Sequence, residues 1–385
     1  MASATPSIHA GPIFDIAPPS CVSDTLDERV SYRTALIGLS WIAADPAAPA
    51  SDPVLGTAVP GSHASAMAAI PEIEVVAGCD IAPAARDRFI QQWGGRWQGL
   101  RVYDDYHTML ERERPDIVAI VTPDHLHTSP LLAAIEFGAR GIFCEKPLAT
   151  SLDEADQIVA AAASSGVAVC VDYTRRWMPE FVEARRRIRS GAIGRLSQII
   201  LQLGGPRAML FRNHTHMIDL LNYYADADAE WVVAELEPDL SDYGTTYRGD
   251  GGADPSTDPG ANYYVAFANG VRAYVSGMKD TVPDLRVDLI GARGRLSLDA
   301  EGFRLITFES EDVRTTPPVT RIQRLSPTWT VSGIQAAMLD LIAAMQTGRE
   351  TASPPESARR TVAITQAILE SQARGNAPVR VAGVP

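Results

Sequence analysis

Short apolar runs alternate with amphipathic stretches over the first half of the chain. Five of these runs have the length and composition of buried strands. They cover residues 34–37, 74–79, 116–123, 141–144 and 167–171. The stretches at 62–70 and 129–138 have the apolar spacing of helices, and Gly138 ends the second of them. Strands that alternate with helices in this way predict a doubly wound, parallel Rossmann sheet.

The pattern changes near Arg176, where strand-like segments follow one another directly. These segments cover residues 198–203, 262–267, 271–276, 286–290 and 304–308. Asn-Gly and other glycine-containing turns separate them, which favours an antiparallel sheet. Two helical stretches, at 334–346 and 356–373, close the chain. The second half is therefore predicted to form an α/β domain with a large, mostly antiparallel open sheet.

Length and composition agree with two folded domains. The chain has 385 residues, more than one core usually supports, and 46% of them are apolar. We predict an N-terminal arm over residues 1–31, a Rossmann domain over 32–173 and the second α/β domain over 174–385. The arm lacks the basic start and apolar core of a secretory signal, so a cytoplasmic location is expected.

Charge and cysteine content argue against several classes of function. The formal net charge of −13 disfavours a nucleic-acid partner. No apolar run approaches the roughly 20 residues that a membrane-spanning helix needs. The four cysteines are scattered, and their spacing matches neither a disulfide framework nor a zinc site.

Glu145-Lys146-Pro147 carries the clearest chemical signal in the sequence. It follows the run at 141–144 directly, so a carboxylate and an ammonium group stand at the carboxyl end of a predicted strand. Open α/β sheets bind their ligands at that edge. Burial and neighbouring charges can shift the pKa of a lysine towards neutrality, which would let Lys146 donate and accept protons.

Three motifs share the order and spacing of one enzyme family. They are Thr122-Pro123-Asp124-His125-Leu126-His127, Glu145-Lys146-Pro147-Leu148-Ala149 and Thr215-His216-Met217-Ile218-Asp219. In this arrangement they resemble the glucose-fructose oxidoreductase/inositol dehydrogenase (Gfo/Idh/MocA) family, over residues 32–385. The resemblance implies an NAD(H)-dependent oxidoreductase that moves a hydride between nicotinamide and a hydroxyl-bearing carbon of a sugar, glycoside or cyclic polyol. It also implies a homodimer or homotetramer, because the exposed face of the family's second sheet commonly packs against another subunit.

Lys146 and His216 match the catalytic pair of that family. By this resemblance Lys146 holds the reacting hydroxyl, and His216 takes its proton as the hydride leaves. Imidazole suits the task because its pKa lies near neutrality. Asp219 shares a helix face with His216 and is a candidate substrate ligand. A metal site is conceivable because His214, His216 and Asp219 cluster in the sequence, but the family's usual chemistry needs no metal.

The predicted cofactor loop departs from the Rossmann pattern Gly-x-Gly-x-x-Gly. Gly38-Leu39-Ser40 follows the first strand, and Ser40 replaces the middle glycine. Gly56 or Gly61 could supply the third glycine after an insertion over residues 41–60. This departure weakens the inference that the chain binds a dinucleotide but does not exclude binding. The alternative is a Rossmann domain that has lost its dinucleotide.

Asp80 ends the second strand, where a carboxylate accepts hydrogen bonds from ribose hydroxyls and repels a 2′-phosphate. NAD is therefore favoured over NADP, although Arg86 and Arg88 lie near enough in the sequence to leave NADP open. The structural alternative for Asp80 is a helix cap. By resemblance, the other cofactor-binding residues are Thr122, Pro123, His127, Glu145 and Lys146.

Arg212 stands four residues before His216, where the family commonly has an aspartate. A guanidinium cannot act as a base, but its planar donors can bind a carboxylate or sugar hydroxyls. We expect Arg212 to orient a larger glycoside or an anionic sugar. Arg176 and Trp177 resemble the family's interdomain Arg-Phe-x-Pro element, and they could stack on a sugar ring or equally pin the domain interface.

Two alternative functions stay open. A glycosidase on the same fold could use tightly held NAD for transient oxidation of its substrate. A non-catalytic sugar or nucleotide sensor is favoured by the broken glycine loop and by Arg212. Retained nicotinamide absorbance in the purified protein would separate the enzymes from the sensor, and release of an aglycone would separate the two enzymes.

Overall fold

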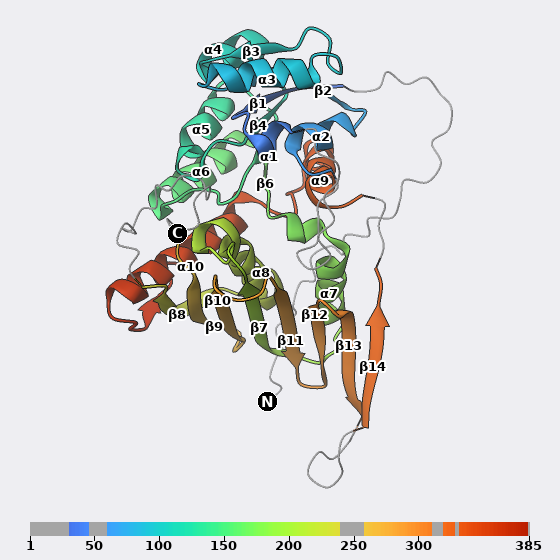
Figure 1. Cartoon of the computed structure of the whole chain (residues 1–385), viewed down its shortest axis with the longest axis vertical. Coiled ribbons are helices and arrows are strands. Elements are labelled where there is room, and N and C mark those ends of the chain that lie inside the picture. The colour runs from blue at the N-terminus through green and yellow to red at the C-terminus, as the bar shows by residue number, and fades with distance from the viewer. Residues whose placement is uncertain (1–30, 46–59, 239–257, 310–318, 328–330, 384–385) are drawn as a thin grey trace, which may run out of the picture. The chain divides into compact units, whose positions relative to one another are not determined.

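The described part of the chain folds around two β-sheets in this computed structural model (Figure 1). The structure describes residues 31–45, 60–238, 258–309, 319–327 and 331–383. All of them lie in one of the chain's two units, Ser31–Pro385. The predicted arm, most of the insertion at 41–60 with Gly56, and most of the Gly/Asp/Pro-rich loop at 239–260 lie outside the described residues.

The first sheet has six parallel strands in the order β3-β2-β1-β4-β5-β6. The strands are β1 (Tyr32–Ile37), β2 (Ile73–Cys79), β3 (Arg101–Tyr103), β4 (Ile117–Ile120), β5 (Gly141–Cys144) and β6 (Ala168–Val171). β4 and β5 are buried at every position, as expected for strands covered on both faces. The strand order reverses between β1 and β4, which is the doubly wound topology predicted from the sequence.

Helices cover both faces of the first sheet. They are α1 (Trp41–Ala44), α2 (His63–Ala68), α3 (Pro83–Trp93), α4 (Tyr106–Glu113), α5 (Thr128–Glu136) and α6 (Leu152–Ser165), with a 3₁₀ turn η1 (Asp124–Leu126) before α5. α9 (Gly333–Thr347) joins the same core from far along the chain, because Met338 and Leu341 pack with Met67 and Phe89. The first sheet is thus completed by a helix from beyond the second sheet, and the predicted division into domains at 173/174 stays a prediction.

The second sheet has nine strands in the order β14-β13-β12-β11-β7-β10-β9-β8-β15. They are β7 (Leu196–Gly204), β8 (Ala229–Leu236), β9 (Ala261–Phe267), β10 (Arg272–Met278), β11 (Leu285–Gly291), β12 (Gly294–Asp299), β13 (Gly302–Glu309), β14 (Val319–Leu325) and β15 (Val379–Arg380). Among the described residues, β7 and β10 pair in parallel and the other neighbours are antiparallel. The prediction of a large, mostly antiparallel sheet is confirmed.

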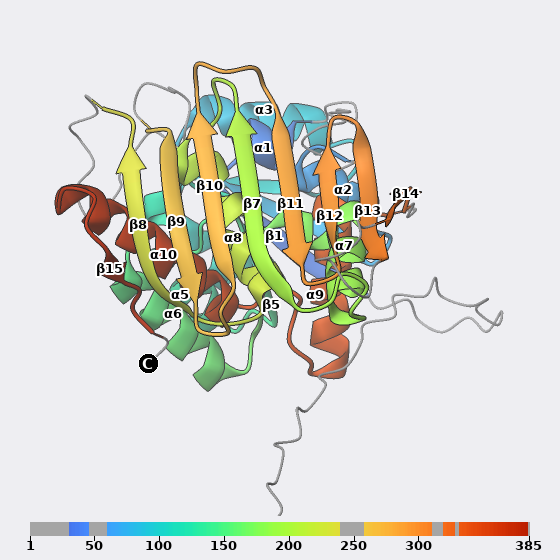
Figure 2. The same ribbon diagram turned by 90° about the horizontal axis from the view of Figure 1, so that it is seen from below.

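One face of the second sheet is packed against helices and the other face is open (Figure 2). The packed face is covered by α7 (Pro179–Arg189), α8 (Thr215–Ala225) and α10 (Pro355–Ala373). Alternate residues of β7, including Ile199 and Leu201, point into this core. Two short turns lead into the helices, a 3₁₀ turn η2 (Thr174–Trp177) before α7 and a π-helical turn η3 (Leu210–His214) before α8.

None of the helices in the described part of the chain is long and apolar enough to cross a membrane.

Candidate functional site

Four of the predicted cofactor positions follow adjacent strands of the first sheet at its carboxyl edge. They are Gly38 after β1, Asp80 after β2, Thr122 after β4 and Glu145 after β5. Side chains that are distant in the sequence are therefore brought to one edge, next to the point where the strand order reverses. Ligands of doubly wound sheets bind at this place.

Gly38 makes the tight turn that brings the first loop close to its neighbour. Its φ is +90°, and a Cβ there would lie 2.5 Å from the carbonyl oxygen of Val121. Both facts require glycine, because a side chain would be strained and would clash. Gly38 therefore fits the place of the first glycine of the dinucleotide fingerprint, which makes the tight turn after the first strand.

The helix described directly after this loop is short. α1 has four residues after Ser40, which is exposed, and the next helix among the described residues begins at His63 after the cap residue Ser62. A Cβ at Gly61 would meet no atom within 4 Å. Gly61 therefore does not show the close helix packing expected of the third glycine of the fingerprint. This geometry does not support Gly61 as that third glycine.

Asp80 is held in place by main-chain donors. Its Oδ2 accepts a 2.8 Å hydrogen bond from Leu39 N, and its Oδ1 accepts one of 2.8 Å from Ala82 N. Two nearby guanidinium groups bind main-chain carbonyl oxygens: Arg86 binds that of Asp80 at 2.6 Å, and Arg88 binds that of Leu39 at 3.2 Å. A carboxylate with spare acceptor lone pairs thus lies beside the glycine loop, which fits binding of two ribose hydroxyls.

His127 is fully buried and lies between two carbonyl oxygens. Its Nδ1 is 2.7 Å from the oxygen of Pro147, and its Nε2 is 3.0 Å from the oxygen of Thr122. The ring therefore ties the loop after β4 to the loop after β5. This geometry favours a positioning role at the cofactor edge, and direct cofactor contact by His127, Thr122 or the exposed Pro123 stays a prediction.

Glu145 belongs to a buried network that the sequence did not reveal. Its Oε1 is 3.0 Å from His63 Nε2, and its Oε2 accepts a 3.0 Å hydrogen bond from Lys146 N. Asp172, which follows β6, lies 3.7 Å from the same His63 nitrogen. His63 is the first residue of α2, so the network links that helix to the ends of β5 and β6.

The two carboxyl groups of this network have opposite pKa shifts. Burial alone would raise the pKa of Glu145, but the hydrogen bond with His63 and the charge of Lys146 lower it. Burial and the charge of Glu145 raise the pKa of Asp172 to about 7. The donor atoms of His63, Glu145 and Asp172 lie within 4.8 Å of one another, a spacing that a metal ion also accepts. Because both Glu145 oxygens already have hydrogen-bond partners, we interpret the group as a network that fixes the loop carrying Lys146.

Lys146 is buried and reaches the elements around the second sheet. Its side chain is bonded through Nζ to the carbonyl oxygen of Arg212 at 3.0 Å. Burial lowers its pKa, the nearby charge of Arg212 lowers it further, and Glu145 opposes the shift. The lysine can therefore release a proton more readily than a free lysine.

His216 lies in the first turn of α8 with its pKa strongly lowered. Burial is the main cause, and four cationic side chains add to it: Arg175, Lys146, Arg212 and Arg207. The edge of the ring packs against Tyr173 with centroids 6.0 Å apart, and the Tyr173 hydroxyl is 3.2 Å from Thr215 Oγ1. The imidazole is thus neutral near neutral pH, and its unprotonated ring nitrogen can accept a hydrogen bond.

Asp258 holds the π-helical turn that precedes His216. Its fully buried carboxyl accepts 3.0 Å hydrogen bonds from Phe211 N and Arg212 N. Burial is the main reason why its pKa is raised to about 7. The residue comes from the end of the Gly/Asp/Pro-rich loop, and no sequence motif there indicates a specific contact.

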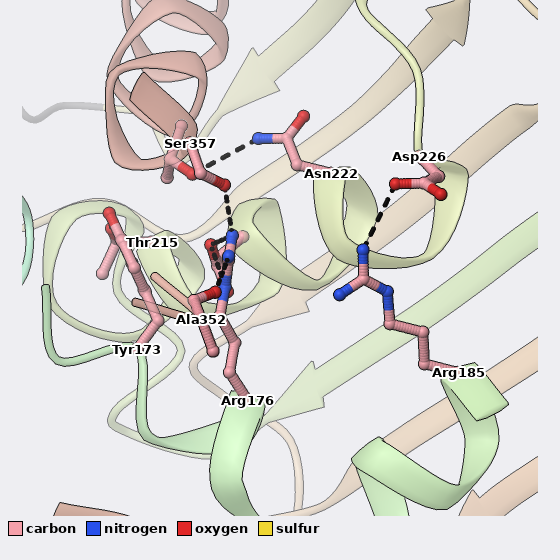
Figure 3. Close-up of polar contacts among 10 residues, drawn as sticks. Tyr173, Arg176, Arg185, Thr215, Asn222, Asp226, Ala352 and Ser357 are labelled. Carbon is pink, nitrogen blue, oxygen red and sulfur yellow. Dashed lines mark hydrogen bonds and ion pairs between the residues drawn. The ribbon is translucent and has the colours of Figure 1, made fainter. Parts of the chain in front are cut away.

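Arg176 and Asp219 form a buried ion pair with each other. Arg176 Nη2 is 2.6 Å from Asp219 Oδ1, and the arginine also donates to the Ala352 carbonyl at 2.7 Å and to Ser357 Oγ at 2.6 Å. Figure 3 shows Arg176 pointing towards Ser357 and Ala352. Trp177 is buried in the core of the first sheet. These contacts favour a role at the domain interface over contact with the substrate. Substrate binding by Arg176, Trp177 and Asp219 stays a prediction.

Comparison with known proteins identifies the chain's relatives. Residues 32–173 match the family model described as "Oxidoreductase family, NAD-binding Rossmann fold" (Gfo/Idh/MocA). The chain is 26% identical over 333 residues to D-apiose dehydrogenase of Paraburkholderia graminis, covering 82% of this chain and 85% of the relative. It is 27% identical over 244 residues to scyllo-inositol 2-dehydrogenase (NAD(+)) of Bacillus subtilis, covering 59% of this chain and 65% of the relative.

Solved structures show the same fold. A levoglucosan dehydrogenase in complex with NADH and L-sorbose superposes with a TM-score of 0.72. The match covers 92% of this chain and 100% of that chain, at 19% sequence identity. This likeness confirms the predicted fold class, and the family model over residues 32–173 confirms the resemblance predicted from the three motifs and the NAD cofactor.

Proposed function

Because residues 32–173 belong to the Gfo/Idh/MocA oxidoreductase family with its NAD-binding Rossmann fold, we propose that the protein is an NAD(H)-dependent dehydrogenase of a sugar, glycoside or cyclic polyol. The relatives with known activity include dehydrogenases of apiose and of inositol. The same chemistry suits this chain, since it has a dinucleotide edge on the first sheet and a proton-transfer pair beside it.

The observation that carries the proposal is the hydrogen bond from Lys146 to the carbonyl oxygen of Arg212. It places the ammonium group at the middle residue of the π-helical turn that leads into α8, and His216 lies in the first turn of α8. This contact, together with the electrostatic effect of Lys146 on His216, supports a common role of the two side chains in proton transfer. A substrate hydroxyl there would be held by Lys146 and would lose its proton to the neutral imidazole.

The cofactor site fits NAD at the carboxyl edge of the first sheet. Gly38 allows close approach of the main chain, and Asp80 offers acceptors for the ribose hydroxyls. NAD supplies the hydride acceptor when it is bound. Lys146 follows β5 at this edge, where it would orient the substrate hydroxyl towards the cofactor.

A screen of substrates tests the proposal. Sugars, inositols and glycosides are offered with NAD and with NADP, and nicotinamide reduction is followed by absorbance. Oxidation of at least one polyol, with His216→Ala inactive on it, is the expected result. Binding of NAD without oxidation of any compound would instead favour the sensor, and release of an aglycone would favour the glycosidase.

The open face of the second sheet supports self-association as part of the same proposal. Trp231, Tyr264 and Tyr274 form a row of rings on β8, β9 and β10, with centroids 4.9 Å and 5.2 Å apart. Tyr274 is 44% exposed, and such apolar surface often marks an interface. We expect a homodimer or homotetramer by light scattering, with Tyr274→Asp shifting the protein towards monomer. A cytoplasmic location remains part of the proposal.

A further inference from the structure

Arg207 and Arg212 present two guanidinium groups without partners among the described residues. Arg207 is exposed and Arg212 is half-buried. Their main-chain atoms are held firmly: Arg212 N donates to Asp258, the Arg212 carbonyl accepts from Lys146, and the Arg207 carbonyl accepts from Asn213. Neither side chain makes a hydrogen bond or ion pair with a residue that the structure describes. Within the described part of the chain, two cationic groups on a fixed main chain are therefore left without a counter-charge.

These arginines lie beside the proposed proton-transfer pair. Arg212 and Arg207 both act on His216 electrostatically, together with Lys146 and Arg175. The Lys146 hydrogen bond to the Arg212 carbonyl fixes the distance between the lysine and the turn at 3.0 Å. A substrate that reaches Lys146 and His216 therefore also comes within range of the two guanidinium groups.

The carboxylates of this region are already committed elsewhere. Glu145 is bonded to His63, Asp219 to Arg176, and Asp258 to two main-chain nitrogens. Asp124 is buried and acts on Lys146 from the loop after β4. Partial burial of the Arg207 guanidinium group lowers its pKa, and repulsion by the charge of Arg212 lowers it further. An anion placed between them would relieve this repulsion.

We propose that the natural substrate carries an anionic group, a carboxylate or a phosphate, which Arg207 and Arg212 bind while Lys146 and His216 act on a hydroxyl of the same molecule. The inference rests on the proposed dehydrogenase function and names its substrate class as an anionic sugar or polyol. Arginine suits this task because its planar donors match carboxylate and phosphate oxygens in pairs. A neutral polyol offers no charge to bind both groups.

The test compares matched neutral and anionic probes. Glucose is compared with glucuronate and glucose 6-phosphate, and myo-inositol with its monophosphate, by steady-state NAD reduction. The anionic member of at least one set should have a kcat/KM about 10-fold to 100-fold higher, as expected for charge-assisted hydrogen bonds. The two acids distinguish a carboxylate from a phosphate. The advantage should shrink as sodium chloride is added, because salt screens the attraction.

Variants assign the effect to the two arginines. Arg212→Gln and Arg207→Gln should each raise the KM for the preferred anion about 10-fold while changing kcat by less than about 3-fold. The matched control is Arg195→Gln, since Arg195 is exposed and precedes β7, whereas Arg207 follows the same strand. The control should behave like the unmodified protein.

Different failures separate the inference from the proposed function. Equal use of neutral and anionic probes, or unchanged KM in both variants, overturns the anion site and leaves the dehydrogenase intact. If no probe is oxidised, the dehydrogenase is wrong for these compounds, and calorimetry of the NAD-loaded protein with glucuronate and glucose 6-phosphate then decides the anion site. Saturable binding that Arg212→Gln abolishes supports it, and absence of binding overturns it.

Discussion

Lys146 Nζ donates a 3.0 Å hydrogen bond to the main-chain carbonyl oxygen of Arg212. This contact joins the carboxyl edge of the first sheet to the π-helical turn that leads into α8. The amide nitrogen of Arg212 is itself bonded to the buried carboxyl of Asp258. The turn is thus held on two sides, so the position of His216 depends on contacts made by both sheets.

Removal of either proton-transfer group should abolish most of the turnover. Lys146→Ala and His216→Ala are each expected to lower kcat by roughly 100-fold or more, because a positioned acid or base contributes about that much. NAD binding by calorimetry should stay within about 3-fold of the unmodified protein if the loss is in chemistry.

His107→Asn provides the control, since His107 is an exposed histidine on α4. Its turnover should be unchanged. Near-normal turnover in Lys146→Ala or in His216→Ala would mean that the substrate proton leaves by another route.

Asp80 should set the preference for NAD over NADP. Its carboxylate lies beside the glycine loop, where it binds ribose hydroxyls and would repel a 2′-phosphate. The unmodified protein should bind NAD(H) more tightly than NADP(H) in calorimetry, and Asp80→Ala should narrow the difference. In Asp80→Ala, the guanidinium groups of Arg86 and Arg88 would be the charges that remain near the 2′-phosphate of NADP. Equal affinities in the unmodified protein would refute the assignment.

The strands and helices were predictable where their patterns were long or strongly apolar. The run at 141–144 became β5, and the stretch at 356–373 became α10. β3, with three residues, and β15, with two, are too short to give a pattern of their own. The sequence also could not show that α9 packs on the first sheet, because only the folded chain brings Met338 into the same core as Phe89.

The candidate site was predictable only in part for a similar reason. Lys146 and His216 stand in motifs with a recognisable order, so their roles could be proposed in advance. His63 and Asp172 lie in no recognisable motif. Their role is visible only in the structure, where His63 Nε2 lies 3.0 Å from Glu145 and 3.7 Å from Asp172. The one feature that could have pointed to His63 was its place at the start of a predicted helix, after the insertion that follows the glycine loop.

The protonation of Asp172 should make the protein's stability depend on pH. Burial and Glu145 raise its pKa from 3.8 to about 7, so the folded protein keeps a proton that the unfolded chain releases between these values. The contribution of Asp172 to the free energy of unfolding therefore falls as pH rises from about 4 to about 7. Asp172→Asn cannot release this proton and should lose the dependence.

Urea unfolding at pH 5 and pH 8 measures this effect. The free energy of unfolding of Asp172→Asn, relative to the unmodified protein, should be higher at pH 8 than at pH 5. The comparison between variants cancels the titration of other groups. A difference that stays constant or changes in the opposite direction would place the proton elsewhere in the network with His63 and Glu145.

Breaking the buried pair between Arg176 and Asp219 should destabilise the fold more than it alters substrate binding. Both side chains are almost inaccessible to water, at 4% and 1% exposure. Asp219→Asn leaves the guanidinium without its counter-charge, and loss of one partner of such a pair costs about 3–5 kcal/mol. Asp226→Asn is the matched control, because Asp226 pairs at the surface with Arg185 (Figure 3) and with Arg189. Exposed pairs contribute about 0–1 kcal/mol, and asparagine tolerates the positive φ of 53° at this position.

Urea unfolding and steady-state kinetics of the same variants decide between the two roles considered for Asp219. An interface role predicts a large loss in the free energy of unfolding for Asp219→Asn, with KM changed by less than about 3-fold in the fraction that stays folded. A double variant, Arg176→Met with Asp219→Leu, should recover much of the stability, since no buried charge is left unpaired. The opposite result, unchanged stability with a KM raised about 10-fold or more, would return Asp219 to the substrate site. It would also mean that Arg176 orients the carboxylate towards the substrate and does not chiefly join η2 to α8.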